Sequence, residues 1–285
     1  GIDKLVLMPQ PFPDDEKFQM NIEIFAEALS AHPDELAFFA GGESLNKMID
    51  AVADQDTVSQ EVLDEFENKA RELITLGAVG FGETTALHFS LADGHPYEEV
   101  DADHPLFLLL ADLAAEYDVP LDIHMEAVPE DMAFPWSDRI TSNENPEFLN
   151  ENIEAFERLL DHNKEATIIW AHAGWGNTGK RTPELMDRLL SDHENLYMSI
   201  KIGKDSVVET RPMNKDGELR SDWLDLLSKY PDRFFMGTDK FYQNSMNQTD
   251  APDPNEGREY FLSLLPDDLE YQITVTNPSL IFLGK

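Results

Sequence analysis

The stretch ATIIWAH at residues 166–172 is an almost continuously apolar run that ends in a histidine, and this pattern is the strongest indication of the fold class. Uninterrupted apolar runs are typical of parallel strands, because both faces of a parallel sheet are covered. Three further runs end in a residue that can bind a metal: residues 78–82 before Glu83, residues 121–123 before His124 and residues 236–238 before Asp239.

Seven apolar runs, of which this stretch is one, alternate with amphipathic segments over the whole chain. We expect these runs to be strands: residues 4–8, 36–40, 78–82, 120–124, 166–171, 196–200 and 233–237. Between them, Leu63, Phe66, Ala70 and Leu73 illustrate the helical spacing of apolar residues. Helix starts are expected at Asp103, as a cap before Pro105, and at Thr182-Pro183. No linker-like stretch divides the chain, so residues 1–285 are predicted to form one α/β domain.

Two architectures fit this alternation, an open doubly wound sheet and a closed (β/α)8 barrel. An open sheet that binds nucleotides carries a glycine-rich phosphate loop after its first strand, and this sequence has none. Barrels collect their functional residues at the carboxyl ends of the strands. The polar residues that end four of the runs therefore favour the barrel.

Composition excludes several classes of function. The chain has 57 acidic and 21 basic residues and a formal net charge of −36, which argues against a nucleic-acid partner. No apolar run approaches the roughly 20 residues that span a bilayer, so we expect no membrane partner and a soluble chain. The simplest interpretation of the acidic excess is a well-solvated surface that keeps the protein soluble, and adaptation to a salty environment is the second interpretation. Cysteine is absent, and both a cytoplasmic and a periplasmic location stay open.

The four polar residues at the strand ends predict a catalytic metal site. Nitrogen and oxygen ligands without thiolates suit Zn²⁺, Mn²⁺ or Fe²⁺. Such a metal would lower the pKa of a bound water and polarise a carbonyl group, while an aspartate beside it takes the proton of the water. A single histidine or carboxylate at a strand end is more often a structural group or a helix cap. Their common position on four strands favours a shared site.

These motifs resemble a known family. GFGE at residues 80–83, VPLDIH at 119–124, WAHAG at 170–174 and PDRFFMGTD at 231–239 look like the strand-end motifs of the amidohydrolase superfamily, and most resemble its branch of metal-dependent TIM-barrel hydrolases and decarboxylases. The ending TNPSLIF at residues 276–282 is also similar. The resemblance covers nearly the whole chain.

The resemblance implies a role for each of the four residues. His124 and His172 match the metal-binding histidines after the fifth and sixth strands. Asp239 matches the aspartate after the eighth strand, which binds metal and serves as the general base. Glu83 falls where relatives place a lysine or glutamate that often bridges two metals. The resemblance thus implies a divalent metal, with zinc favoured over manganese or iron, and catalytic roles for His172 and Asp239.

One element of the family pattern is missing. The first strand of the family carries a His-x-His pair, and none of the eight histidines has that spacing. The motif order makes residues 4–8 correspond to the second strand, so we expect a TIM barrel that lacks its first strand in this chain. Either that strand precedes this chain in the gene, or the protein is a natural variant with a reduced site. We expect the gap to be filled by a missing segment, by a strand swapped from a partner or by a homodimer contact.

Four other residues are expected to bind substrate. Glu126 and Trp175 lie on loops that should face the pocket, although packing of the loops explains them equally well. Lys201 and Arg211 are basic residues that could attract a carboxylate, although surface acids are alternative partners. The leading hypothesis is a hydrolase that cleaves an amide, ester or lactone bond of a small carboxylate-bearing molecule. The alternatives are a non-oxidative decarboxylase, a pseudoenzyme without a complete metal site and a nucleotide-binding sheet.

Overall fold

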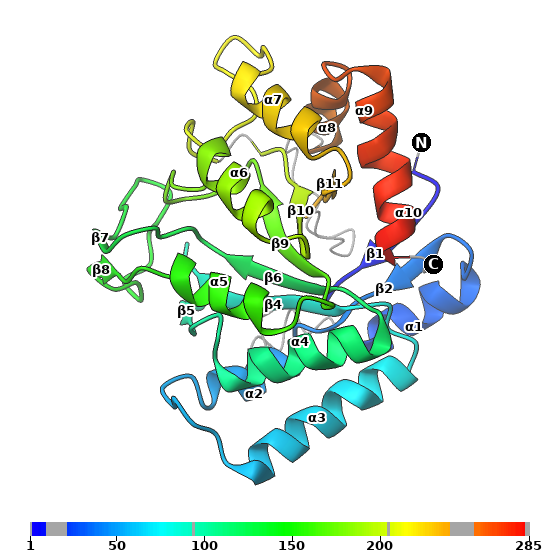
Figure 1. The fold of residues 1–285 in the computed structure, drawn as a ribbon, viewed down its shortest axis with the longest axis vertical. Helices are drawn as coiled ribbons and strands as arrows, with labels where there is room; N and C mark the ends of the chain where they lie inside the picture. Colours follow the sequence, from blue (N-terminus) through cyan, green and yellow to red (C-terminus); the bar gives the residue numbers. More distant parts are fainter. Residues whose placement is uncertain (1, 10–21, 93–94, 204–205, 240–253, 283–285) are drawn as a thin grey trace.

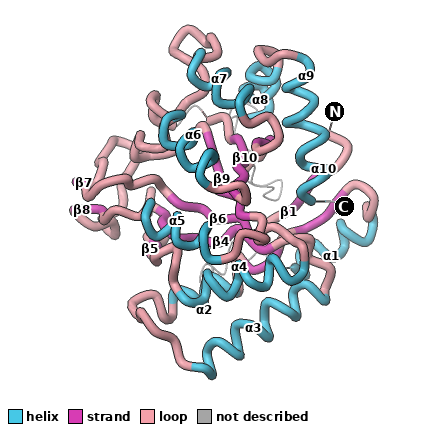
Figure 2. Tube along the Cα trace, in the orientation of Figure 1, coloured by secondary structure: helices cyan, strands magenta, loops and turns pink. Residues whose placement is uncertain are grey.

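The structure is a computed structural model that describes residues 2–9, 22–92, 95–203, 206–239 and 254–282. Parallel strands gather in its centre and helices surround them (Figures 1 and 2). The strands are β1 (Leu5–Leu7), β2 (Leu36–Phe38), β3 (Ala40–Gly41), β4 (Phe81–His88), β5 (Glu98–Glu99), β6 (Leu121–Met125), β7 (Met132–Ala133), β8 (Phe148–Leu149), β9 (Ile168–Ala173), β10 (Leu196–Ile200) and β11 (Phe234–Met236).

The helices alternate with these strands along the chain. They are α1 (Ile22–Ala31), α2 (Leu45–Asp50), α3 (Gln60–Thr75), α4 (Pro105–Tyr117), α5 (Ile153–His162), α6 (Pro183–Asp192), α7 (Ser221–Lys229), α8 (Pro254–Leu262), α9 (Asp267–Tyr271), the π-helical turn η2 (Gln272–Thr276) and α10 (Asn277–Phe282). Among the described helices, none has both the length and the apolar character that a bilayer crossing requires.

The sheet has the parallel order that the alternation predicts. Strands β3, β4, β6, β9, β10 and β11 are neighbours in that sequence, and β1 pairs in parallel with β2. Strands β2 and β3 are two halves of one stretch interrupted at Phe39, whose N–H donates to the Leu7 carbonyl at 2.8 Å. The next amide, that of Ala40, donates to Gly80 at 3.1 Å. All seven predicted strands are therefore present and follow one another around the molecule.

The interior of this arrangement is a small apolar cluster, separate from the larger core between strands and helices. Phe39, Ile169 and Phe235 form its buried centre. Partly buried residues from β1, β10 and α10 pack against it. Apolar side chains directed inward from several strands are the filling of a barrel. Gly80 is required beside Phe39, because a Cβ atom there would lie 2.4 Å from the Phe39 ring.

The barrel is open between β11 and β1, where no strand pairing is found within the described ranges. Helix α10 lies beside this opening (Figure 1). The ring of Phe282 at its end meets Phe39 at 5.6 Å and Phe235 at 5.0 Å between centroids, edge-on in both cases. The described strands thus leave the ring open, and a helix of the same chain, which was not among the predicted fillers, packs beside the opening.

Two local predictions were wrong. The cap of α4 is His104, whose Nδ1 accepts from the Leu106 N–H at 3.2 Å, whereas Asp103 pairs with Arg158. Strand β4 was expected to end before Glu83, but it begins at Phe81 and continues to His88. Thr182 caps α6 as predicted, accepting from the Leu185 N–H at 3.4 Å.

Candidate metal centre

Glu83 lies near the start of β4 on a backbone that its neighbours hold tightly. The side chain of Asn46 donates to the Glu83 carbonyl at 3.2 Å, and its amide oxygen accepts from the Thr85 N–H at 3.0 Å. Gly42 packs against the same segment, since a Cβ on it would lie 2.9 Å from the Glu83 carbonyl oxygen. The carboxylate is consequently fixed in place and only 9% of the residue is exposed.

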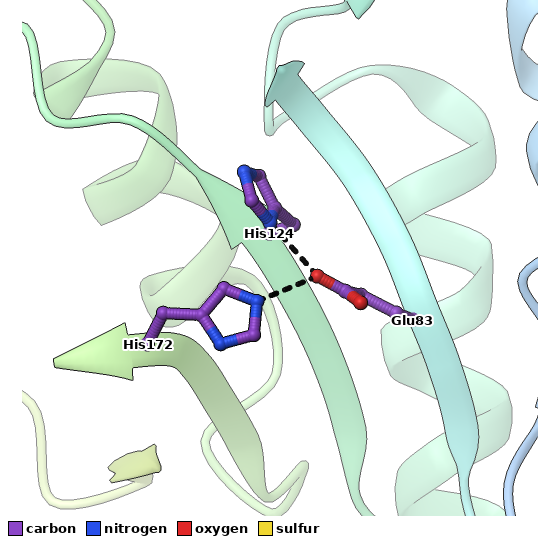
Figure 3. A group of neighbouring side chains, drawn as sticks. All are labelled: Glu83, His124 and His172. Carbon is purple, nitrogen blue, oxygen red and sulfur yellow. Dashed lines mark hydrogen bonds and ion pairs between the residues drawn. The ribbon is translucent and has the colours of Figure 1, made fainter. Parts of the chain in front are cut away.

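Two histidines point at this carboxylate from neighbouring strands (Figure 3). Nδ1 of His124, on β6, lies 2.8 Å from Oε1 of Glu83, and Nε2 of His172, on β9, lies 2.9 Å from the same oxygen. Both histidines are buried and their ring centroids are 5.1 Å apart. Three strands that follow one another in the barrel thus direct two nitrogens and one oxygen to a single point.

His172 reaches this point through an unusual backbone conformation. Its φ is +68°, in the left-handed region that non-glycine residues rarely adopt. Its N–H donates to Oγ of Ser199 on the adjacent strand β10 at 3.1 Å. Non-glycine residues in this region are enriched at functional sites. Asp239 is the other predicted site residue with this feature, at φ +43°.

The charges of the two imidazoles control the protonation of Glu83. Burial raises the pKa of the Glu83 carboxyl, but the charge of His172 and hydrogen bonds from both histidines outweigh burial and hold the pKa well below its usual range. The carboxylate is therefore ionised while it accepts from both rings. An ionised carboxylate with two imidazoles is the donor chemistry of a divalent transition-metal site.

The donor set fits a metal ion. The three ligand atoms of Glu83, His124 and His172 lie within 4.8 Å of one another, and all three residues are buried. The two histidine nitrogens lie 2.8 and 2.9 Å from the Glu83 oxygen. Zinc binds nitrogen and oxygen ligands at about 2.0–2.2 Å, so these atoms need to move apart only slightly to surround an ion. Three protein ligands also leave positions open, as catalytic metal sites do.

Asp239, the fourth predicted ligand, lies outside this group. Its carboxylate forms an ion pair with Nζ of Lys201. The ammonium of Lys201 also lies 3.8 Å above the centroid of the Trp175 ring, and that ring stands 6.2 Å from His172. The structure therefore brings together three of the four predicted ligands and links the fourth to them through Lys201 and Trp175.

The other predicted substrate-binding residues have partners within the protein. Glu126 accepts from the N–H of Asn177 at 2.9 Å and from its side-chain amide at 2.6 Å, so its carboxylate connects the loops after β6 and β9. Arg211 donates to the Ser206 carbonyl from Nε at 2.8 Å. Their roles toward a substrate stay predictions.

A small cavity adjoins the histidines. It has a volume of about 10 Å³, which is the room that one water molecule needs. Its lining includes His124, Glu126, His172 and Trp175, together with Arg181. Four residues named from the sequence therefore share one cavity, and a basic residue that was not named completes it.

Two buried ionisable residues beside the site were missed by the sequence analysis. Arg181 stacks on Trp170 at 3.8 Å and donates to the Trp170 carbonyl at 2.7 Å, and burial lowers the pKa of its guanidinium to about 9. Asp122 lies two residues before His124, and burial, followed by the charge of Glu83, raises the pKa of its carboxyl well above the usual value. The alternation that turns His124 inward also turns Asp122 inward, so this residue was recognisable.

Two more histidines extend the site: His88 at the end of β4, and His95 in the segment between β4 and β5. The ring of His88 lies 5.0 Å from that of His124 and 4.6 Å from that of His95. His88 Nδ1 lies 3.1 Å from the Pro96 carbonyl, which can only accept, so this nitrogen carries the proton. Burial, together with the charges of His124 and His95, lowers the pKa of His88 well below its usual value.

Comparison with known proteins finds structures of similar fold. No protein-family model matches the chain, and no curated protein sequence does. Among solved structures, 2,6-dihydroxybenzoate decarboxylase from Rhizobium aligns with 92% of this chain and 75% of its own at a TM-score of 0.51 and 16% identity. A probable 2-pyrone-4,6-dicarboxylic acid hydrolase from Acinetobacter baumannii aligns with 98% of this chain and 83% of its own, at a TM-score of 0.51 and 13% identity.

The chain shares the barrel fold of these two proteins. At these identities the likeness establishes the fold, which confirms the fold class predicted from the strand-end motifs.

Proposed function

We propose that the protein is a metal-dependent enzyme that hydrolyses an amide, ester or lactone bond of a small carboxylate-bearing molecule. The observation that carries the proposal is the convergence of two buried imidazole nitrogens on one carboxylate oxygen at the functional end of a barrel. The fold, shared with a probable pyrone-dicarboxylic acid hydrolase, supports it.

In this proposal Glu83, His124 and His172 hold a divalent metal, with zinc favoured and manganese or iron as alternatives. The bound metal supplies Lewis acidity and lowers the pKa of water. A metal ion there would take lone pairs from His124 Nδ1 and His172 Nε2 in place of the hydrogen bonds between these nitrogens and Glu83. The buried position of the three residues excludes bulk water from the reacting bond.

Asp239 acts as the general base in this reaction. Its carboxylate accepts the proton of the attacking water and later delivers it to the leaving group. Lys201 and Trp175 lie between Asp239 and His172, where they can bind and orient a negatively charged part of the substrate. Attack of water at the carbonyl carbon and departure of the protonated leaving group complete the hydrolysis.

A decarboxylase is the second candidate. The fold matches a 2,6-dihydroxybenzoate decarboxylase with the same TM-score as the hydrolase. Assays of release of CO2 from hydroxybenzoates and of hydrolysis of lactone dicarboxylates, run on the same metal-loaded preparation, separate the two reactions. Turnover of only the hydroxybenzoates would replace the hydrolase proposal.

The metal site is tested by the substitution His172→Ala. We expect about one Zn²⁺ or Mn²⁺ per chain in the wild type, and an affinity at least about 100-fold weaker in the variant, because one of three protein ligands is lost. Elemental analysis and competition with a chromophoric chelator measure both quantities. His32→Ala, which removes an exposed histidine, is the matched control and should bind metal as the wild type does.

Wild-type protein that takes up neither metal would contradict the enzyme proposal and favour a pseudoenzyme. Unchanged affinity in His172→Ala would remove this histidine from the site. Circular dichroism of the variant checks that the fold persists, as expected for a residue at the functional end of a barrel strand.

A further inference from the structure

The ends of β9, β10 and β11 are aligned side by side by backbone hydrogen bonds. The N–H of Lys201 donates to the Ala173 carbonyl at 2.9 Å, and the N–H of Gly237 donates to the Ile200 carbonyl at 2.9 Å. Gly237 packs closely on Ser199, since a Cβ on it would lie 3.0 Å from the Ser199 Cβ. This alignment places His172, Lys201 and Asp239 on three consecutive strand ends.

Lys201 stands in the middle of these three ends and engages both neighbours. Its ammonium pairs with the Asp239 carboxylate on one side and lies over Trp175 on the other. The side chains of Lys201 and Asp239 are 16% and 19% exposed, so water screens their attraction only in part. A cation over an indole ring is held there by the ring quadrupole.

We propose that Lys201 is a latch that keeps Asp239 away from the metal centre until a metal ion binds. In the arrangement described, the carboxylate of Asp239 neutralises Lys201 and lies outside the group formed by Glu83, His124 and His172. A divalent cation beside the two histidines competes with one ammonium for the same carboxylate. Recruitment of Asp239 as the fourth predicted ligand therefore has to break the Lys201–Asp239 pair, and the latch lowers metal affinity.

The latch rests on the proposed function, because it presumes that the three-residue group binds a metal. It adds a positioning role for Lys201, which acts on the metal through Asp239. The alternative is a purely general effect, in which a positive charge near the site repels a cation whatever its partner is. The two explanations differ in one respect: only the latch requires the carboxylate of Asp239.

A double-mutant cycle measures this difference through metal affinity alone. Wild type, Lys201→Met, Asp239→Asn and the double variant are titrated with Zn²⁺ and with Mn²⁺ against a chromophoric chelator. We expect Lys201→Met to bind about tenfold more tightly than wild type, because the competing ion pair is gone. In the Asp239→Asn background the same substitution should change the affinity by less than about twofold.

Two controls complete the set. Lys201→Arg keeps the positive charge and should bind metal as wild type does. Lys180→Met removes an equal charge from an exposed side chain about 4.0 Å from Glu130, and it should leave the affinity unchanged.

Each outcome decides between the explanations. Metal binding by wild type that becomes about tenfold tighter in Lys201→Met, with no such gain in the Asp239→Asn background, would support the latch. An equal affinity in wild type and Lys201→Met would overturn the latch and leave the metal-site proposal intact. A gain that persists without the Asp239 carboxylate would overturn the latch in favour of general repulsion. Absence of binding in all four proteins would overturn both proposals.

Discussion

At the scale of single residues, Glu98 offers a protonation test that is separate from the catalytic question. This glutamate on β5 is buried opposite His88, and burial, together with the negative charges of Asp50 and Glu83, raises the pKa of its carboxyl to about 8. The folded protein thus holds a proton on Glu98 at neutral pH that the unfolded chain releases.

The sign of the effect follows from this difference. A carboxyl with a raised pKa in the folded state contributes its full stability below about pH 4.5, and that contribution is lost as the pH rises toward 8. Glutamine does not titrate, so the Glu98→Gln variant lacks this pH-dependent fall in stability. Its free energy of unfolding should rise relative to that of wild type by on the order of 2 kcal/mol between pH 5 and pH 8. Urea unfolding at both pH values measures the gain. A constant difference between the two proteins would show that Glu98 does not titrate in this range.

At the scale of elements, the final helix is tied to the barrel by one asparagine. The Asn277 side-chain amide donates to the Pro231 carbonyl at 2.7 Å and to the Phe234 carbonyl at 2.6 Å, and its oxygen accepts from Gln272 at 2.8 Å. This buried side chain therefore joins α10 to the entry of β11. The ending that resembles the amidohydrolases thus has a structural reason in this chain.

The loss of stability on substituting Asn277 should depend on the group that the new side chain directs at the two carbonyls. Asn277→Ala leaves both carbonyls without this donor and should cost about 2 kcal/mol of unfolding free energy. Asn277→Asp directs an acceptor at them and should cost more than alanine does. Ser279→Ala, at an exposed position of the same helix, is the control and should stay within about 0.5 kcal/mol of wild type. An alanine variant as stable as wild type would show that the amide donors contribute nothing.

The helices and strands also show how much of the fold could be predicted from the sequence. Apolar runs identified all seven strands, because a strand covered on both faces must be apolar throughout. The same reasoning placed His124 and His172, since barrels gather function at the carboxyl ends of their strands. It misplaced the end of β4, because the segment around Glu83 remains a strand through hydrogen bonds to both neighbouring strands.

Long-range pairing lay beyond the sequence. Nothing in the chain order indicates that Lys201 meets Asp239, or that Arg181 is buried against Trp170. Both contacts depend on how loops and strand ends meet in space. The helix packed at the open side of the barrel was missed for the same reason, since Phe282 meets Phe39 across nearly the whole chain length.

At the scale of the whole molecule, charge dominates. A formal net charge of −36 on 285 residues makes the folded state repel itself. Added salt screens this repulsion, with a Debye length that falls from about 30 Å at 0.01 M to about 3 Å at 1 M. We therefore expect the melting temperature to rise between about 0.01 M and 0.5 M potassium chloride, when measured by differential scanning calorimetry.

A metal-free preparation is the appropriate sample for this measurement, because bound metal would stabilise the fold independently. Sucrose solutions of matched osmolality serve as the control for effects other than screening. A melting temperature that does not change with salt would show that the surface charge carries no net destabilisation.

The contact between Lys201 and Trp175 also gives the protein an intrinsic fluorescence signal. The electric field of an ammonium 3.8 Å from an indole centroid alters the emission of that ring. Displacement of Lys201 therefore changes the light from Trp175 without any added label. Trp170 and Trp223 are fully buried and Trp136 is exposed, so a Trp175→Phe variant supplies the background signal when a stopped-flow fluorimeter follows the strand ends in real time.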